Sequence, residues 1–443
     1  MNSLLEFSDT TTPFSTQPYD EVRWAFVGLG ARGGGHVKTV LQLENAHVTA
    51  LADPYAPTLE SVTEQVREAG RETPFTVSQP GDAWQRILER DDVDAVVIST
   101  AWEDHAPMAV AAMQAGKHAF IEVPAAVTLE ECWQLVETAE TTGTHCMMLE
   151  NCNYGREELM LLNMVRQGLF GELLHGEAAY IHDLREHMTA VEHGTGSWRT
   201  LHYANDQGSL YATHGVGPLA HCMDVNRGDT FSHIVSLSSP ARGRKLHAQQ
   251  HFPPGHKWNQ IPLWQCGDIN TSIIQLASGK TMMVQWDETT PRPYSRHNFL
   301  QGTRGAFGGF PNRIALDYAI DELPASLHAT VPVKDGRTNT HEWDTNLEPW
   351  FQLYDHPLWK KLSDEALEHG GHDGMDFIMF YRIQQCLLNG EPLDQSVYDA
   401  ALWSSVRPLS RASIEQRGAP QDFPDFTRGK WRTTPPVTIA SQY

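Results

Sequence analysis

Three glycines at a fixed spacing are the first residues of this chain that could do chemistry. Gly28, Gly30 and Gly33 fit the pattern G-x-G-x-x-G, which lets the backbone approach a pyrophosphate at a helix N-terminus. Asp53 follows about twenty residues later and can accept hydrogen bonds from the hydroxyls of an adenosine ribose. Because its negative charge would repel a 2′-phosphate, the pattern predicts NAD rather than NADP.

Charged residues near these glycines carry weaker signals, and each has a second interpretation. Arg32 could pair with the pyrophosphate or be a solvated charge at a helix start. Glu122 ends an apolar run, where its carboxylate would lie near the nicotinamide ribose or only cap a loop. Asp53 itself could be a turn residue before Pro54.

A second concentration of reactive side chains lies at residues 208–221. The segment holds Tyr211, Thr213, His214 and His221 among three glycines and a proline. Most of the 22 histidines in the chain must be structural, but His214 is crowded by glycines and follows Tyr211 by three residues. We therefore expect His214 to be a site residue, with His221 the weaker candidate.

Other aromatic and histidine residues allow less specific predictions. Tyr294 lies beyond a strand end next to prolines, as a positioned phenol or a surface aromatic. Trp102 and Trp198 are candidate faces for stacking on a sugar. The histidines could be metal ligands at two places, but no spacing matches a metal motif, so no metal is predicted. These places are His182, His187 and His193, and His369 and His372.

Short apolar runs alternate with helical patterns through residue 151, which predicts a parallel, doubly wound sheet. Strands are expected at 22–30, 47–53, 93–100, 118–124 and 145–151, with residues 101–105 beginning a loop. A capping box at Thr128–Glu131 should open a helix that runs to about residue 142. Ligands bind beyond the carboxyl ends of such strands. This rule selects Gly28–Gly34, Asp53, Trp102–His105, Glu122–Val123 and Asn151.

The pattern changes after about residue 155. An amphipathic helix at 155–172 precedes alternating segments, one of which has a hairpin signal at Ser278-Gly279, and a further helix is expected near 373–389. This is typical of an antiparallel or mixed sheet with one packed face. The fold class is therefore α/β: an N-terminal Rossmann domain plus a second α+β domain with a large, mostly antiparallel sheet. The expected boundaries are a polar tail at 1–20, an NAD-binding domain at 21–152 and a substrate-binding domain at 153–443.

Composition excludes several classes of partner. Lys plus Arg number 33 and Asp plus Glu 55, a formal charge of −22, which disfavours nucleic acid and anionic membranes. No apolar run could cross a bilayer, and the first twenty residues have no secretory signal, so a cytoplasmic protein is expected. The six cysteines form no CxxC pair, which favours buried, reduced thiols.

Longer motifs then occur in order along residues 22–432, and the chain closely resembles the NAD-dependent glycosidases of glycoside hydrolase family 109, within the Gfo/Idh/MocA oxidoreductase group. The founding activity of that family is α-N-acetylgalactosaminidase. The motifs are GLGARGGGH, AWEDHAPMA, GKHAFIEVPAAVTLEECW, MMLENCNY, NMVRQGLFGE, GSWRT, LYATHGVGPLAH, NRGD, PRPYS, QGT, DHPLWKK, GHDGMDF and DFTRGKW.

The resemblance implies two sets of contacts, matched motif by motif. The implied NAD contacts are Ala31, Arg32, Asp53, Trp102, Glu103, Asp104, His105, Glu122, Val123 and Asn151. The implied sugar contacts are Tyr180, Arg199, Tyr211, Ala212, Thr213, His214 and Tyr294. Ala31 and Asp104 look like substitutions relative to more usual family residues, which backbone contacts would tolerate. The N-terminus lacks the twin-arginine export signal that some members carry.

Two departures from the wider oxidoreductase group disfavour a plain dehydrogenase. Ordinary sugar dehydrogenases of this fold carry Glu-Lys-Pro, with the lysine serving the hydroxyl that is oxidised, and here that lysine is Val123. They also carry Asp-x-Gly-x-His, whereas the equivalent here reads Thr213-His214-Gly215-Val216-Gly217.

The first hypothesis is therefore a glycosidase in which NAD⁺ takes hydride from C3 of the sugar, C2 is deprotonated, the C1 substituent leaves, water adds, and C3 is reduced again. His214 or Tyr294 would be the base at C2, Tyr211 or Tyr180 would serve the hydroxyl, and Arg199 would position the sugar. The alternatives are a conventional NAD-dependent sugar dehydrogenase and a non-enzymatic sugar or nucleotide sensor. A homo-oligomer formed through the second-domain sheet is also expected.

Overall fold

The computed structural model describes residues 14, 16–437 and 439, and the predicted polar tail at 1–20 lies largely outside them. The first sheet is parallel, with strand order β3-β2-β1-β4-β5-β6, as a doubly wound domain requires. Its strands are β1 (Val22–Val27), β2 (Ala46–Ala52), β3 (Phe75–Val77), β4 (Ala95–Ile98), β5 (His118–Ile121) and β6 (Cys146–Met148). Its helices are α1 (Ala31–Val40), α2 (Ala56–Glu68), α3 (Trp102–Gln114) and α4 (Leu129–Thr142).

Local sequence explains most of these elements. Strands β4 and β5 are buried along their whole length because helices cover both faces of the sheet. The predicted capping box is confirmed: Thr128 and Glu131 cap α4, and Gly143 ends it at φ +67°. The prediction of a loop at 101–105 is wrong, because α3 already begins at Trp102. Two acidic residues in its first turn, Glu103 and Asp104, stabilise the helix because their negative charges lie at the positive end of the helix dipole.

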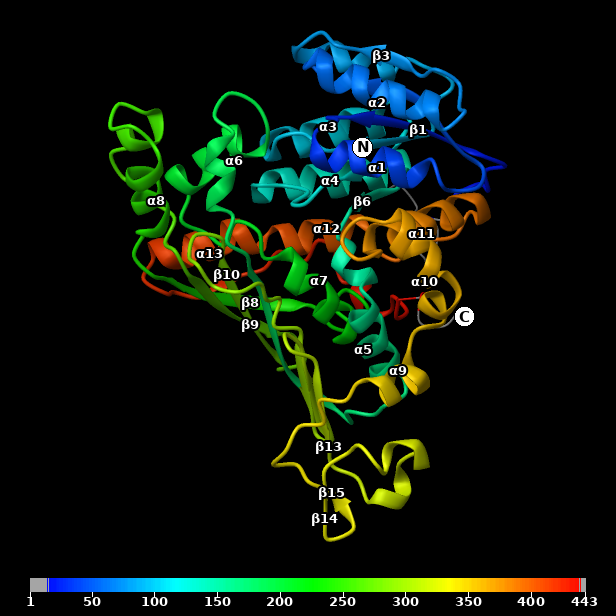
Figure 1. Ribbon diagram of the computed structural model, residues 1–443, viewed down its shortest axis with the longest axis vertical. Helices are drawn as coiled ribbons and strands as arrows, with labels where there is room; N and C mark the ends of the chain where they lie inside the picture. The colour runs from blue at the N-terminus through cyan, green and yellow to red at the C-terminus, as the bar shows by residue number, and fades with distance from the viewer. Residues whose placement is uncertain (1–13, 15, 438, 440–443) are drawn as a thin grey trace, which may run out of the picture.

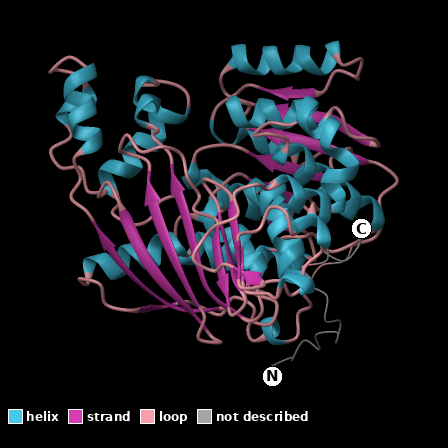
Figure 2. Ribbon diagram, turned by 60° about the horizontal axis from the view of Figure 1, so that its bottom comes forward, coloured by secondary structure: helices cyan, strands magenta, loops and turns pink. Residues whose placement is uncertain are grey.

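The second sheet has eight strands in the order β13-β12-β11-β7-β10-β9-β8-β16. Among the described strands of this sheet only β7 and β10 pair in parallel, which confirms a mostly antiparallel sheet. Figure 2 shows it as one broad layer apart from the smaller sheet. The strands are β7 (Leu173–Ile181), β8 (Phe231–Ser238), β9 (Asn270–Leu276), β10 (Thr281–Asp287), β11 (Phe299–Gly302), β12 (Gly305–Gly308), β13 (Arg313–Leu316) and β16 (Gln421–Asp422), with β14 (Val333–Lys334) and β15 (Arg337–Thr338) as a separate hairpin.

Helices of the second half pack on both sheets. They are α5 (Arg156–Arg166), α6 (Thr195–Asn205), α7 (Thr213–Cys222), α8 (Gly243–His251), α9 (Glu348–Tyr354), α10 (Pro357–His369), α11 (Met375–Asn389), α12 (Val397–Ser404) and α13 (Val406–Glu415). Helix α7 lies so close to β7 that a Cβ on Gly215 would stand 2.4 Å from the Ala179 nitrogen. That glycine therefore lets His214 sit beside the strand that carries Tyr180.

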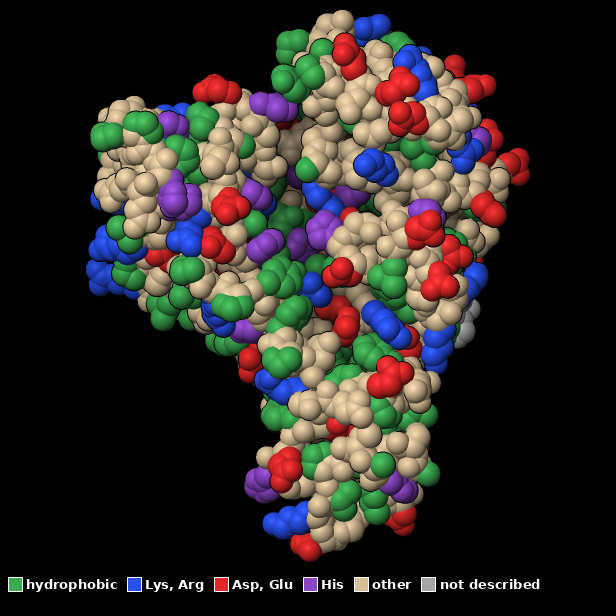
Figure 3. Space-filling model, in the orientation of Figure 1, with side chains coloured by type: hydrophobic (Ala, Val, Ile, Leu, Met, Phe, Trp, Pro, Cys, Tyr) green, Lys and Arg blue, Asp and Glu red, His purple; other side chains and the backbone are tan. Residues whose placement is uncertain are grey.

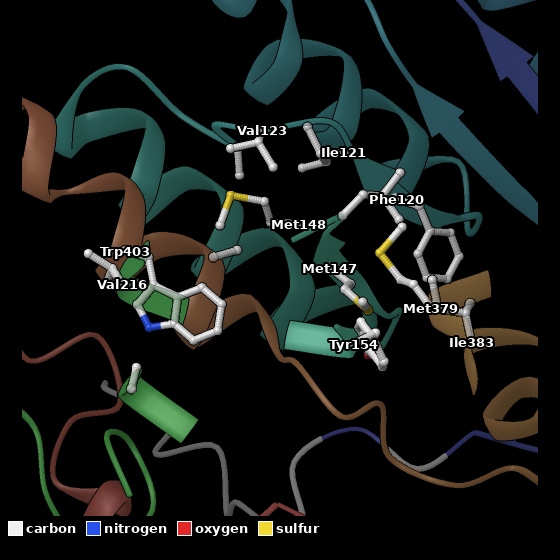
Figure 4. Close-up of a cluster of buried hydrophobic side chains, with 14 of the residues drawn as sticks. Phe120, Ile121, Val123, Met147, Met148, Tyr154, Val216, Met379, Ile383 and Trp403 are labelled. Atoms are coloured by element: carbon white, nitrogen blue, oxygen red, sulfur yellow. The ribbon is translucent and has the colours of Figure 1, made fainter. Parts of the chain in front are cut away.

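The C-terminal helices return to the first sheet, so one core joins the two halves. Helix α12 packs on α4 and β6, and α11 packs on α1 (Figure 1). Figure 4 shows side chains of β5 and β6 meeting those of α7, α11 and α12; they include Phe120, Ile121, Met147, Met148, Val216, Met379, Ile383 and Trp403, all buried. The six cysteines are buried and unpaired, which confirms the expectation of reduced thiols. None of the described helices is long and apolar enough to cross a membrane.

A buried ion pair holds the start of α12. Asp399 is fully buried, accepts from Arg227 at 2.6 Å and from Asn226 at 3.1 Å, and completes a capping box with Ser396. Removing the carboxylate would leave the Arg227 guanidinium buried without a counter-charge.

We expect Asp399→Ala to lower the free energy of unfolding by about 3–5 kcal/mol. Urea denaturation followed by circular dichroism measures this change. The matched control is Glu415→Ala, which breaks an exposed pair with Arg411 and should lower the free energy by less than about 1 kcal/mol. Equal losses in the two variants would contradict the assignment.

Candidate active site

A cavity of about 580 Å³ lies where the first sheet ends and the second half begins. Its walls come from the glycine turn, from the carboxyl ends of β2, β4 and β5, and from residues 192–199 and Tyr211 of the second half. Figure 3 shows a hollow near the centre of the face in view, with histidine side chains gathered along it. The location agrees with the rule for ligand binding in open α/β sheets.

The glycine turn has the shape that a dinucleotide needs. Gly28 adopts φ +82°, and a Cβ there would stand 2.5 Å from the Ser99 carbonyl oxygen. A Cβ on Gly33 would stand 1.9 Å from the Gly28 oxygen, so this glycine is needed for close packing of α1 on β1. Gly30 lines the cavity, and a Cβ there would meet no atom within 4 Å, which leaves room for a phosphate against the backbone.

Asp53 lies at the end of β2, in the cavity wall. Its carboxylate accepts from the Leu29 amide at 2.7 Å and from the Tyr55 amide at 2.8 Å, one on each oxygen. A carboxylate oxygen has more than one acceptor site, so Asp53 can still accept from a ribose hydroxyl. The sequence left two interpretations of Asp53, a turn residue or a ribose acceptor. Its backbone contacts fit the first, and its place in the cavity wall keeps it a candidate for the second.

Arg32 forms ion pairs with two carboxylates. Its predicted contact with the pyrophosphate stays a prediction. It donates to Glu122 at 2.8 Å and to Asp376 of α11 at 2.8 Å. Burial alone would raise the pKa of Glu122, but Arg32 and His36 offset it and hold that pKa well below its usual range. The same guanidinium, opposing burial, keeps the pKa of Asp376 well below normal. His372 lies within 2.9 Å of Arg32.

The other predicted cofactor contacts divide into two groups. Trp102, Asp104, His105 and Val123 line the cavity, as do Ala31 and Glu122. His105 faces the carbonyls of Pro124 and Thr100, and burial lowers its pKa. Glu103 and Asn151 are not among the lining residues. Glu103 lies 3.2 Å from His202, and Asn151 donates to Asp376 at 2.8 Å.

The predicted sugar contacts form one aromatic cluster beside the cavity. The Tyr180 ring lies 5.2 Å from Tyr211, 4.9 Å from His214 and 6.1 Å from Tyr294, centroid to centroid. Tyr211 also stacks on Trp102 at 5.7 Å. The structure therefore brings together side chains of β7, α3, α7 and the segment before β11.

Arg199, Ala212 and Thr213 support this cluster from the side. Arg199 lies over the rings of Trp102 and Tyr211 and is paired with buried Glu288, which also accepts from Tyr203. Ala212 is buried just before α7. The Thr213 hydroxyl is buried and makes no hydrogen bond within the described residues. His221 packs on Trp403 deep in the protein, and burial lowers its pKa to about 3, which supports the structural interpretation.

Glu150 is the main site residue that sequence reasoning missed. It is fully buried after β6, and its Oε1 lies 2.6 Å from His214 Nδ1. Because a carboxylate accepts, the proton of this hydrogen bond lies on Nδ1, and in a neutral imidazole Nε2 would then be the acceptor. Cys152 Sγ is close enough to form a possible metal-binding group with these two residues. Burial raises the pKa of that thiol well above its usual value.

Two further neighbours were also missed, although a signal existed. His182 Nδ1 lies 2.9 Å from the Tyr180 hydroxyl, and Arg296 donates to the Tyr294 hydroxyl at 2.8 Å. Each stands two residues after its tyrosine, the spacing that puts side chains on one face of an extended chain. Alternation around each tyrosine could therefore have found both.

Comparisons with known proteins agree with this arrangement. Residues 154–433 match the family model "Glycosyl hydrolase 109, C-terminal domain", and residues 22–150 match "Oxidoreductase family, NAD-binding Rossmann fold". The chain is 53% identical over 420 residues to "Glycosyl hydrolase family 109 protein 2" of Shewanella sp. (strain MR-4), covering 95% of this chain and 88% of that protein. It is 52% identical over 419 residues to "Glycosyl hydrolase family 109 protein" of Shewanella amazonensis, with the same coverage.

Solved structures share the fold at low identity. A levoglucosan dehydrogenase in complex with NADH and levoglucosan aligns with a TM-score of 0.66 at 18% identity, over 92% of this chain and 100% of that one. A putative myo-inositol dehydrogenase from Sinorhizobium meliloti 1021 aligns with a TM-score of 0.61 at 15% identity, over 91% and 100%. These likenesses confirm the two-domain fold.

A ring contact between the two halves lies beside the cavity. The Tyr55 ring, just after Asp53, lies 4.2 Å from the His193 ring at an angle of 31°. His193 and Gly194 also line a second, open hollow of about 570 Å³ between α1 and α2. The segment that carries them therefore borders both the cavity and this hollow.

We expect His193→Ala or Tyr55→Ala to speed the release of NAD about two- to tenfold, because an aromatic pair contributes roughly 0.5–1.5 kcal/mol. Stopped-flow fluorescence with an NADH chase measures the rate. His247→Ala, which removes a ring contact with His251 on α8, serves as control. An unchanged release rate in both test variants would show that this contact does not retain the cofactor.

Proposed function

Because the chain belongs to glycosyl hydrolase family 109, we propose that it is a glycosidase that cleaves α-N-acetylgalactosaminide-like glycosides with tightly bound NAD as a catalytic cofactor. The observation that carries this proposal is the continuity of one site. A dinucleotide-shaped cavity adjoins a cluster of three phenols and a carboxylate-bound imidazole.

The chemistry that bound NAD⁺ would supply is reversible hydride acceptance at C3 of the sugar, which acidifies the proton on C2 and lets the C1 substituent leave by elimination. Gly28, Gly30, Gly33 and Asp53 would hold the dinucleotide. The apolar side chain of Val123 in the cavity wall supports this route over a plain dehydrogenase, because dehydrogenases of this fold carry a lysine there.

His214 is the proton acceptor in this proposal. Its Nδ1–H is bound by Glu150, which leaves Nε2 free to take a proton from the sugar, and the buried carboxylate would stabilise the imidazolium that forms. Tyr294 is less suited to be the base, because burial raises its pKa to about 12 and it is a neutral phenol near pH 7.

The remaining phenols are donors in this proposal. Burial raises the pKa values of Tyr180 and Tyr211 well above 10, so both are protonated. Tyr211 can then donate to a sugar oxygen, and Tyr180 can do so when His182 Nδ1 is the donor of the hydrogen bond between them. Arg199 would hold the rings of Trp102 and Tyr211 in place. Its charge is already paired with Glu288 and is therefore less suited to bind the sugar directly.

The buried carboxylates near the site argue against the usual pair of glycosidase acids. Glu122 binds Arg32, Glu150 binds His214 and Glu288 binds Arg199, so each is committed to a different partner. A conventional glycosidase needs two carboxyl groups that face the same glycosidic bond. The hydride route requires no such pair.

The test of the overall reaction uses the purified protein with p-nitrophenyl α-N-acetylgalactosaminide. We expect nitrophenol release without accumulation of NADH absorbance, a primary isotope effect from deuterium at C3, and uptake of solvent deuterium at C2. Stoichiometric NADH from free sugar would instead support a dehydrogenase. Sugar binding without turnover on a panel of glycosides would support a sensor.

We expect His214→Gln to lower kcat by about 10²–10⁴-fold, the range for loss of a general base, while NAD affinity is retained. Glu150→Gln should lower kcat less, because the imidazole stays in place without its counter-charge. Steady-state assays and an NAD titration provide the two values. His251→Gln on the surface helix α8 is the control, and a kcat for His214→Gln equal to that of the control would exclude this histidine as the base.

A further inference from the structure

The phenol of Tyr294 is held by a buried ion pair that the proposed reaction has not used. Arg296 is buried, and its Nη1 donates to Tyr294 Oη at 2.8 Å while its Nη2 donates to Glu158 Oε1. Asn298 donates to the same Glu158 oxygen at 3.4 Å. A guanidinium can only donate, so the phenol oxygen must be the acceptor of this bond.

Glu158 is itself held in place by local structure. It lies in the first turn of α5, where the helix dipole favours a negative charge. A Cβ on Gly155 would stand 2.0 Å from Glu158 Oε2, so any larger residue there would displace the carboxylate from its present position. The pair with Arg296 is therefore positioned from both sides.

The backbone that carries Tyr294 and Arg296 is fixed as well. Between these two residues, Ser295 exchanges hydrogen bonds with Ile181 at 2.9 and 3.0 Å, and Ala179 donates to the Arg296 carbonyl at 2.8 Å. The segment therefore extends along β7, the strand that carries Tyr180. Tyr294 is 40% exposed, whereas Arg296 behind it is only 8% exposed.

Since Arg296 donates to its oxygen, the phenol proton of Tyr294 has to point away from Arg296. The rings of Tyr180, His182 and Phe310 lie around the Tyr294 ring, at centroid distances of 6.1, 5.1 and 5.6 Å. A hydrogen bond accepted by a hydroxyl also polarises its own O–H bond and strengthens it as a donor. From this geometry we infer that Arg296, held by Glu158, is a positioning residue that makes Tyr294 a directed hydrogen-bond donor to an oxygen of the bound sugar. The inference rests on the proposed function and adds to it that this phenol donates a hydrogen bond to the sugar.

The test is a double-mutant cycle between the phenol and the ion pair. Arg296→Met/Glu158→Leu removes both charges together, because removing Arg296 alone would strand a buried carboxylate. We expect this variant and Tyr294→Phe each to lower kcat/KM for the nitrophenyl glycoside about ten- to hundredfold, as for loss of one strong hydrogen bond. Combining them should lower it no more than about twofold further, because the ion pair acts only through the phenol.

Three measurements separate positioning from a structural role. Thermal unfolding and NAD affinity should match the wild type in every variant. Arg296→Lys, which can still donate to the phenol, should recover part of the lost kcat/KM. Arg292→Met, which removes an exposed arginine of the same segment bound to Gln285, should have no effect.

The inference would be overturned if the combined variant lost kcat/KM by the product of the two separate losses. It would also be overturned if Tyr294→Phe or Arg296→Met/Glu158→Leu kept the wild-type kcat/KM. If the wild type cleaves no glycoside, the proposed function fails by itself, and the same cycle is then measured on the calorimetric affinity of the NAD-loaded protein for free N-acetylgalactosamine. Equal affinity in wild type and Tyr294→Phe would overturn the inference in that case.

Discussion

The site depends on one constraint: a carboxylate removed from water must meet a positive or hydrogen-donating partner. Glu150 follows a strand of the first sheet and meets His214 of α7, while Asp376 of α11 meets Arg32 of α1. Both contacts join the two halves of the chain. Charge pairing thus holds the imidazole of α7 and the helix α11 against the half of the chain that carries the dinucleotide cavity.

The same constraint limits which side chains of the candidate site can donate a hydrogen bond and which can accept one. The Glu150 carboxylate keeps the proton of His214 on Nδ1 and leaves Nε2 as an acceptor. Burial keeps the phenols of Tyr180 and Tyr211 protonated, and the Tyr180 hydroxyl shares a hydrogen bond with His182 Nδ1. Arg296 blocks the lone-pair side of Tyr294. In the proposed reaction, His214 would be the one acceptor among phenol donors around a polyhydroxylated ring.

Sequence patterns predicted the first domain well because its signals are local. The glycine spacing, the acid after β2 and the capping box of α4 each depend on residues close in the chain, and the hairpin of β9 and β10 was found in the same way. The start of α3 was missed because its acidic first turn looks like a loop. Glu150 and Asp376 were missed for another reason: their roles come from partners more than sixty residues away. His182 and Arg296 are the exceptions, since their spacing from Tyr180 and Tyr294 was visible.

The way the halves join also suits a reaction that returns its electrons. In such a cycle the cofactor leaves each turnover in the state in which it entered, so release of the dinucleotide serves no chemical purpose. A shared core fixes α11 and α12 against the first sheet, whereas a ring contact between Tyr55 and His193 joins the two halves beside the cavity and the hollow between α1 and α2. In the proposed cycle the dinucleotide would enter by movement of the short segment around His193, with the core and the paired charges left intact.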